Sequence, residues 1–404
     1  MEMTGPLRHF QPAENIAAGN VVDSTDNGLV TSVVRTWPEL AALATEWNDL
    51  LRKSRADTIF LTWEWLWSWV RATGQTRDPF VIVVRDDQGA LVGVAPFYAT
   101  AYRLLKLIPY RVLRLMADYP TGAEYPDWIA RRDHEAEVLA AIAGVLSAHR
   151  RCWDAVWMPN IAAWSGAHER LERACRGAGL DFRSRPVPFS RIELPKGGGE
   201  YLGVLSANMR SALRRQARKI MGSEDVVVDQ CSSVESLPEY LQALFALHHR
   251  RWKLKGEEGV FRRKPAERLF YEHFAAEALK AGWLRLYALR DHGAIKAVQI
   301  GYVYNNTFHL LQEGFDPDYL DGAGNVLRLN VIESCIRDGI AQYDFLGGTS
   351  EHKHRWQAAE REGCDVVITN PGMKGRFLFR RGIWPTGRFL RPAADLGAAG
   401  KQPV

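Results

Sequence analysis

The sequence contains few cysteines, and none of them stands in a paired spacing. Its five cysteines are scattered over 404 residues, their number is odd, and no two form a C-x-x-C motif. This distribution argues against a disulfide framework and against a zinc site, so we expect no metal and a reducing, cytoplasmic environment. A G-x-S-x-G motif and a Cys-His pattern are also missing, so a covalent nucleophile is not indicated.

Long hydrophobic runs are missing as well. No stretch approaches ~18 uninterrupted apolar residues, so the sequence predicts no transmembrane helix. The N-terminus lacks a basic region followed by an apolar core, which excludes a secretory signal, and we interpret residues 1–30 as a flexible tail. The net charge of +5 is below that of a dedicated nucleic-acid binder, but it is compatible with anionic small molecules, RNA or an acidic membrane.

What the chain does contain is an α/β unit that occurs twice. Residues 80–98 and 284–302 each read as a strand, an Arg-Asp turn closed by Gly, and a second strand, which is typical of a β-hairpin. Each hairpin is preceded by a helical stretch and followed by a helix and a strand: 60–74 and 135–160 in the first copy, 240–256 and 325–348 in the second. We interpret this as an internal duplication with a mostly antiparallel sheet; the alternative is a chance similarity of two α/β segments.

The duplication predicts two domains of similar size. The stretch 185–201 is rich in Pro and Gly and marks the boundary between them. We therefore expect domains at residues 31–190 and 191–375, followed by a basic aromatic tail at 376–404.

Several stretches together resemble a known family. In the second half they are LRRQARKI (213–220), LFALHHRRWKLKGEEGVF (244–261), 282–304, FDPDYLDGAGNVL (315–327) and YDFLGGTSEHKHRW (343–356). This half resembles the acetyltransferases of the GNAT superfamily, specifically the CelD/BcsL-like group named for cellulose biosynthesis. The first half is similar to that family's degenerate N-terminal unit through residues 60–70 and 118–129.

The resemblance covers residues 35–375 and implies a fold and an activity. The implied fold is α/β (α+β), with two tandem GNAT-like domains, each a mixed, mostly antiparallel sheet flanked by helices, as in Fem-type aminoacyl transferases. The implied reaction transfers an acyl group from acetyl-CoA or another acyl-CoA to an amine or hydroxyl of a small molecule, saccharide or lipid. Two positions depart from the family pattern, Ala323 in place of a polar residue and His352 where Tyr is common.

The predicted donor site is the segment GFDPDYLDGAGNVLRLN (314–330). A strand leads into a glycine-rich loop and then a helix, whose free N–H groups and positive dipole end suit a pyrophosphate. Coenzyme A carries such a group, and we expect Gly322, Gly324, Asn325 and Val326 to bind it. The alternative interpretation is a tight turn with Asp321 or Asn325 as the helix cap.

The predicted catalytic residues are His248, Glu313, Asp344 and Lys353. Lys353 follows a buried strand and can neutralise a phosphate or an oxyanion, while Asp344 can accept a proton or orient a cation. His248 can act as a base, and Glu313 as a base or as the binder of a cationic acceptor. Each residue also has a structural alternative. Asp344 can be a capping or turn residue, and Lys353 can belong to a solvated face. His248 can be a hydrogen-bonded helix histidine, and Glu313 a surface carboxylate.

The predicted substrate-binding residues are Arg214, Arg218, Trp252 and Trp356. Trp252 lies one helical turn after His248, and the resemblance supports Trp356. Arg210, Arg214 and Arg218 follow one another at i, i+4 and i+8, so they line one side of a helix that can meet an anionic substrate, a nucleotide or tRNA. The alternative for this helix is a solubilising face.

One further segment is basic and aromatic. Residues 371–392 contain six Lys or Arg, no acidic residue and several aromatic residues, a mixture that suits weak peripheral contact with an anionic membrane. Residues 104–116 have a similar composition, although a core strand-loop-strand explains them equally well.

The leading hypothesis is an acyl-CoA-dependent N- or O-acyltransferase that transfers the acyl group directly. One alternative keeps the fold and uses aminoacyl-tRNA as donor, as Fem-type enzymes do, and the basic helix permits this. The other is a non-catalytic GNAT-like scaffold in polysaccharide biosynthesis.

Overall fold

The computed structural model describes residues 28–74, 76–105, 107–119, 121–196, 201–254 and 256–385, and the backbone of residues 23–24 and 390–392. The predicted tail at 1–30 and the end of the predicted tail at 376–404 therefore lie largely outside the described residues. No helix in the described part of the chain is long and apolar enough to cross a membrane.

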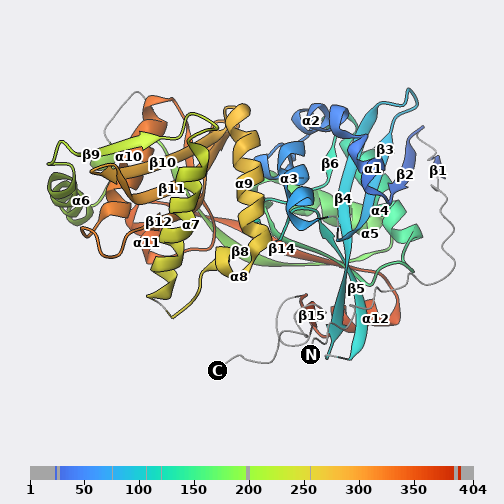
Figure 1. Ribbon diagram of the computed structural model, residues 1–404. Helices are drawn as coiled ribbons and strands as arrows, with labels where there is room; N and C mark the ends of the chain where they lie inside the picture. The colour runs from blue at the N-terminus through green and yellow to red at the C-terminus, as the bar shows by residue number, and fades with distance from the viewer. Residues whose placement is uncertain are drawn as a thin grey trace, which may run out of the picture.

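A single sheet runs through the whole molecule (Figure 1). Its strands within the described residues are β1 (Asp23–Ser24), β2 (Val30–Val34), β3 (Asp78–Arg85), β4 (Leu91–Leu104), β5 (Ile108–Leu115), β6 (Ile129–Ala130), β7 (Ala155–Ile161), β8 (Asp181–Glu193), β9 (Val226–Gln230), β10 (Leu284–Asp291), β11 (Ala294–Tyr304), β12 (Thr307–Phe315), β13 (Gln342–Gly347), β14 (Ala359–Thr369) and β15 (Leu390–Pro392). Their order is β1-β2-β3-β4-β5-β7-β14-β8-β13-β12-β11-β10-β9, with β6 and β15 pairing to β4.

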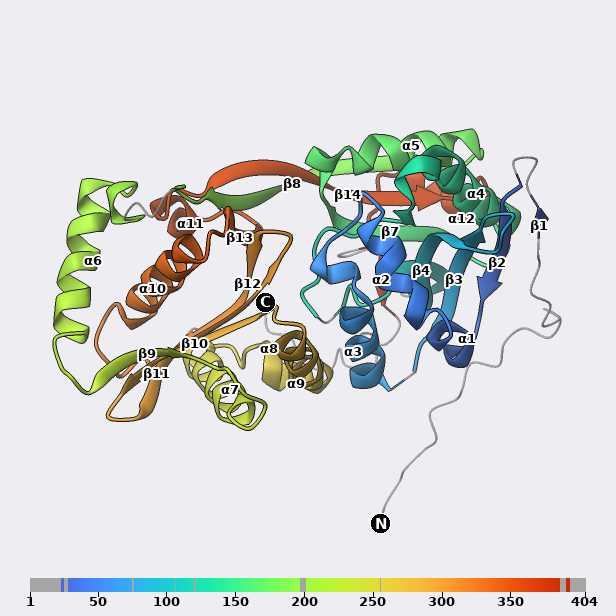
Figure 2. The ribbon, with the colours of Figure 1, turned by 90° about the horizontal axis from the view of Figure 1, so that it is seen from above.

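Helices flank this sheet on both faces. They are α1 (Trp37–Ala41), α2 (Ala44–Arg52), α3 (Trp63–Thr73), α4 (Glu135–Ala148), α5 (Ala167–Gly177), α6 (Ala207–Ile220), α7 (Leu237–Lys253), α8 (Val260–Arg263), α9 (Pro265–Lys280), α10 (Ala323–Arg337), α11 (Glu351–Arg355) and α12 (Met373–Arg380). Figure 2 shows α6 and α10 on the side of the molecule remote from the first half, with α8 and α9 nearer to it.

The two halves of the sheet have the same strand pattern. In the first half β2, β3, β4 and β5 pair antiparallel, and β5 then pairs parallel with β7. In the second half β9, β10, β11 and β12 pair antiparallel, and β12 then pairs parallel with β13. The predicted hairpins are β3–β4 and β10–β11. The structure thus confirms the predicted fold class, a mixed and mostly antiparallel sheet flanked by helices.

The halves exchange their last strands. Strand β8 follows the first half in sequence but pairs with β13 of the second, and β14 follows the second half but pairs with β7 of the first. β8 and β14 also pair with each other along their length. Because β8 runs through the expected boundary at residues 190 and 191, the division into domains at 31–190 and 191–375 remains a prediction.

A shared apolar core also connects the halves. Helices α3 and α9 lie side by side in the middle of the molecule (Figure 1), and the Trp65 ring of α3 packs edge-on against Phe270 and Phe274 of α9 at 4.7 and 4.6 Å. Helix α3 begins at Thr62, whose hydroxyl accepts the Trp65 N–H, and ends at Gly74 with φ +66°. A separate core joins α10 to one face of β11, β12 and β13.

Candidate functional site

The predicted donor loop lies at the start of α10, next to an open cavity. Gly322 precedes the helix with φ +90°, a conformation that favours glycine, and a Cβ there would meet the Gln216 side chain of α6 at 2.2 Å. The first helical bond of α10 runs from the Val326 N–H to the Gly322 carbonyl at 2.9 Å, so the amides of residues 323–325 precede it. Beside them is a cavity of about 360 Å³ that Gly322, Gly324 and Asn325 help to line.

A buried charge network forms the inner wall of this cavity. Arg328 of α10 is only 2 % exposed and donates to the Glu313 carboxylate of β12, which Arg251 of α7 also approaches at 3.3 Å. The other side of the Arg328 guanidinium donates to Nε2 of His352 at 2.6 Å. These contacts connect β12, α7, α10 and α11 at one point.

The network fixes the protonation of its members. Burial alone would raise the pKa of Glu313, but the charges of Arg328 and Arg251 outweigh it and lower the pKa below its ordinary value. Burial and the neighbouring Arg328 lower the pKa of His352 to about 4, so its ring is neutral near pH 7 and accepts the Arg328 hydrogen bond. Glu313 is therefore an ionised partner of two arginines, and its predicted role as a base remains a prediction.

Asp344 is buried at the contact between the two halves. Its Oδ2 accepts a hydrogen bond from the Tyr125 hydroxyl of the first half at 2.7 Å, and its Oδ1 accepts the Leu346 N–H at 2.8 Å. Burial would raise the pKa of Asp344, but His309, Tyr125 and the Leu346 amide together lower it. The carboxylate is therefore ionised and held in a fixed orientation.

Lys353 holds the end of β13. Its Nζ donates to the carbonyls of Phe345, Leu346, Gly347 and Gly348 at 3.1, 3.3, 2.7 and 2.7 Å. The strand bends sharply here, because Leu346 has φ +62°, and burial lowers the pKa of the lysine. The ammonium group thus fixes the backbone beyond Asp344, whereas its action on an oxyanion remains a prediction.

The structure brings together only part of the predicted set. Gly322, Gly324, Asn325 and Glu313 surround one cavity, and Asp344 and Lys353 lie together at the end of β13. Arg214 and Arg218 are exposed on α6, whose Gln216 contacts the donor loop. Their substrate-binding role stays a prediction.

His248 lies apart from these groups, in α7. Its Nε2 accepts the Trp252 Nε1–H at 2.9 Å, and its ring packs against Phe261 at 4.9 Å. Burial lowers the pKa of His248 to about 4. This geometry matches the alternative interpretation of a hydrogen-bonded helix histidine, and the predicted roles of His248 as base and of Trp252 as substrate contact stay untested.

Two predicted binding residues lie in the core, and their roles stay predictions. The Trp356 ring is 0 % exposed and packs between Tyr201 and Arg328 in the core around α10, so it offers no surface to a substrate. The Val326 side chain is equally buried in that core, and its N–H is already bonded to Gly322. Val326 is buried because α10 packs one stripe of its surface against β11 and β12, and Trp356, which follows α11, belongs to the same core.

Three residues of these sites were not predicted from the sequence: Tyr125, His309 and Arg328. Tyr125 lies in the segment 118–129, and His309 lies in the strand that ends at Glu313. Arg328 lies one helical turn after Gly324. A buried polar residue of this kind is found only when tertiary contacts are known.

Comparisons with known proteins agree with the fold. Residues 207–354 match the family model described as an acetyltransferase (GNAT) domain. No curated protein matches the chain. Among solved structures the chain is similar to FemX, with 11% identity, a TM-score of 0.58, and coverage of 84% of this chain and 98% of FemX.

A second solved structure shares this architecture. It is a C-terminal domain from Agrobacterium fabrum named for a lysylphosphatidylglycerol synthetase, with 11% identity, a TM-score of 0.50, and coverage of 85% of this chain and 96% of that one. At such identities these likenesses establish the fold alone. The family match assigns residues 207–354 to a GNAT acetyltransferase domain, a match that supports an acyltransferase.

Proposed function

We propose that the donor is an acyl-CoA whose pyrophosphate lies at the start of α10. The observation that supports this most directly is the open cavity of about 360 Å³ beside Gly322, Gly324 and Asn325. The first turn of α10 contains no acidic residue, and its dipole and the amides of Gly324 and Asn325 favour an anion, although Asp321 before the helix also lines the cavity. Asp316, which also lines the cavity, is neutralised by Arg250 at 2.8 Å.

The proposed reaction is direct transfer. A nucleophilic nitrogen or oxygen of the acceptor attacks the thioester carbonyl carbon, the carbon–sulfur bond breaks, and the acceptor's proton ends on the departing thiol. The protein binds the donor at α10, excludes water and transiently accepts the acceptor's proton. No metal is needed for these steps, and no group of three or more candidate metal ligands occurs among the described residues.

The acceptor is proposed only by class. An amine or hydroxyl of a small molecule, a saccharide or a lipid precursor would suit this chemistry. The stretches at 315–327 and 343–356 support placement in the CelD/BcsL-like group, and exopolysaccharide formation is one role open to the protein beside lipid or secondary-metabolite modification.

An aminoacyl-tRNA donor is the second candidate. The fold-level likeness to FemX favours it, and so does α6, which carries Arg210, Arg214, Arg215, Arg218 and Lys219 next to the donor loop. A tRNA donor would bind with a steep dependence on salt, because binding releases counterions from the phosphates.

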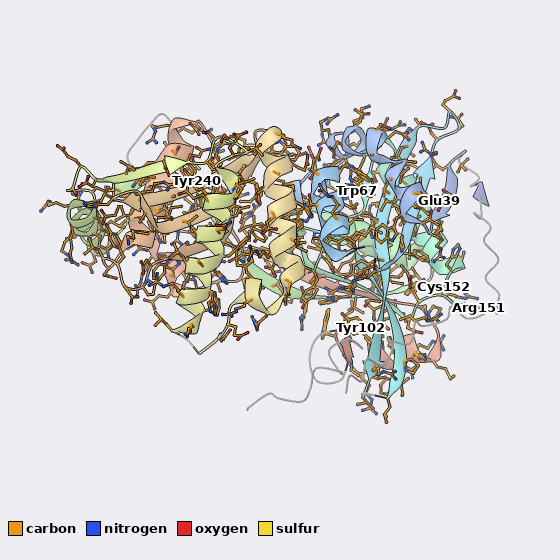
Figure 3. The ribbon with its side chains drawn as sticks, in the orientation of Figure 1. Glu39, Trp67, Tyr102, Arg151, Cys152 and Tyr240 are labelled. Carbon is orange, nitrogen blue, oxygen red and sulfur yellow. The ribbon has the colours of Figure 1, made fainter. Side chains whose placement is uncertain are left out.

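We also propose weak contact with an anionic membrane through the β4–β5 hairpin and α12. Tyr102, labelled in Figure 3, lies where this hairpin leaves the body of the first half. The Tyr110 hydroxyl donates to the Lys374 carbonyl, and the Lys374 ammonium to the Pro109 carbonyl at 2.8 Å, so hairpin and helix form one surface. Leu107 is 78% and Met373 91% exposed on it. Residues 101–111 and 371–385 contain no acidic residue.

The experiment that tests the donor is calorimetric titration with two thioesters. Acetyl-CoA carries the pyrophosphate and S-acetylpantetheine does not. We expect micromolar binding of acetyl-CoA and at least ~10-fold weaker binding of S-acetylpantetheine, a difference of about 1.4 kcal/mol. Equal affinities would contradict the pyrophosphate site, and binding of aminoacyl-tRNA without binding of either thioester would favour the second candidate.

A further inference from the structure

His309 and Asp344 occupy the point at which two parallel strands separate. Strands β12 and β13 pair only from Thr307, Phe308 and His309 to Gln342, Tyr343 and Asp344. Beyond this rung β12 continues along β11, and β13 pairs with β8 at Gly347. The last paired rung of the ladder therefore carries an imidazole on one strand and a carboxylate on the other, at the apex of an opening in the sheet.

The opening has a different chemistry on each face. Phe308 stacks on Tyr343 within the core around α10, the face on which Arg328 and Glu313 border the donor cavity. Successive strand residues point to opposite faces, and the His309 ring accordingly packs against Phe60 of the first half at 5.5 Å. His309 thus lies on the face opposite to the proposed donor site, on the last rung before β12 and β13 separate.

A cavity of about 170 Å³ borders this rung on the side of the first half. Residues of both halves line it, among them Asp57, Tyr125, Trp164, Tyr304, His309 and Asp344. Asp57 is already engaged, because it accepts the Tyr304 hydroxyl at 2.7 Å. Nδ1 of His309 is buried without a hydrogen bond and lies 3.7 Å from Oδ2 of Asp344. This distance is too long for a hydrogen bond, but such bonds often tighten only when substrate binds.

We infer that this cavity receives the amine or hydroxyl of the acceptor and that His309, oriented by Asp344, takes its proton. The inference rests on the proposed function, because it requires a thioester donor on the α10 face. When the acceptor nitrogen or oxygen forms its bond to the carbonyl carbon, its proton passes to the imidazole. The carbon–sulfur bond then breaks, and the imidazolium returns the proton to the thiolate.

The neighbours of His309 suit this role. Asp344 is ionised, and Tyr125 and the Leu346 amide fix its orientation, so it can stabilise an imidazolium beside it. Lys353 holds the carbonyls of the segment that follows Asp344. Tyr125 comes from the first half, which explains how a half without a donor site can still shape the reaction.

The test compares His309→Gln and Asp344→Asn with the wild type, and uses His168→Gln in α5 as the matched control. Acetyl-CoA binding is measured by calorimetry, and thiol release from acetyl-CoA is measured with glucosamine or water as the acceptor. We expect His309→Gln to lower thiol release at least ~100-fold and Asp344→Asn at least ~10-fold, with the acetyl-CoA Kd unchanged within twofold. Added imidazole should partly restore the rate of His309→Ala, which a purely structural histidine would not permit.

The outcomes separate the two proposals. The role of His309 is overturned if His309→Gln releases the CoA thiol at the wild-type rate. It is also overturned if the wild type binds acetyl-CoA but never releases the CoA thiol. Failure of the wild type to bind acetyl-CoA overturns the proposed function, and the role of His309 falls with it. The role of His309 is also overturned if both variants lose folding, as seen by circular dichroism, and imidazole does not restore their rate.

Discussion

The two halves of the molecule share one strand order but differ at corresponding positions. The last paired rung of β12 and β13 holds His309 and Asp344, whereas the last paired rung of β5 and β7 holds Arg114 and Trp157. Arg114 is tied to Asp118 at 2.6 Å, and Trp157 is buried under Trp384. At this position the first half therefore has an ion pair and an apolar ring, where the second half has the proposed proton acceptor.

The helix that follows the central strands differs in the same way. Helix α4 begins with Glu135 and Glu137, and Glu135 is held by Arg170 at 3.1 Å and Arg55 at 3.2 Å. Helix α10 begins with Ala323, Gly324 and Asn325 beside an open cavity. Side-chain carboxylates therefore occupy the positive end of α4, while that of α10 is free for a ligand. The difference supports our proposal that the donor binds to the second half.

The largest expected effect concerns the buried ion pairs, one in each half. Replacing Arg114 by Met leaves Asp118 as a buried charge without its arginine, so this variant should lose ~3–5 kcal/mol of stability. Replacing Arg328 by Met should cost less, because Arg251 still approaches Glu313 at 3.3 Å. Urea denaturation followed by circular dichroism measures this loss. If Arg114→Met unfolds at the wild-type urea midpoint, the Arg114–Asp118 pair does not stabilise the first half as Arg328–Glu313 stabilises the second.

The next effect concerns the end of β13. Lys353→Met removes the cation that holds the carbonyls of residues 345–348, and we expect a loss of ~1.5–3 kcal/mol, the worth of hydrogen bonds to a charged group. Denaturation midpoints measure it, with Lys219→Met at an exposed position of α6 as the control. A variant with wild-type stability and no turnover would instead assign Lys353 to the chemistry alone.

A smaller effect concerns Glu124, which the first half contributes beside Gly347. Burial, with the nearby charge of Asp344, raises the pKa of Glu124 to about 8. The folded state therefore binds a proton that the unfolded state loses near pH 4.5, so wild-type stability should fall as the pH rises from about 4.5 to 8. Glu124→Gln should flatten this fall and be the more stable protein at pH 8.5. An unchanged slope in thermal melts across this range would show that Glu124 is solvated.

The smallest effect concerns the proposed membrane surface, which β4, β5 and α12 form. Leu107→Glu should weaken binding to vesicles containing phosphatidylglycerol by several-fold, because it adds an anion to an apolar tip. Val234→Glu, at a position 51% exposed in the second half, is the matched control. Cosedimentation measures both, and binding of RNA but not of vesicles would favour a nucleic-acid surface instead.

Sequence patterns predicted the architecture well because it is local. The hairpins at 80–98 and 284–302 follow from their apolar runs and the turns between them, and the loop-to-helix start at Gly322 follows from its glycines. The exchange of β8 and β14 between the halves could not be predicted, since strand partners far apart in sequence are set by the whole sheet. For the same reason the sequence did not reveal that Tyr125 meets Asp344, or that Trp356 is a core residue.

The most direct test of the account is the stoichiometry of acetyl-CoA binding by calorimetry. Gly324→Val places methyl groups at the second position of α10, where an added Cβ would by itself lie 3.3 Å from Phe315. Ala136→Val makes the matched change at the second position of α4. We predict one site per chain, lost in Gly324→Val and unchanged in Ala136→Val. Two sites per chain, or binding that survives Gly324→Val and is lost in Ala136→Val, would contradict a donor site confined to the second half.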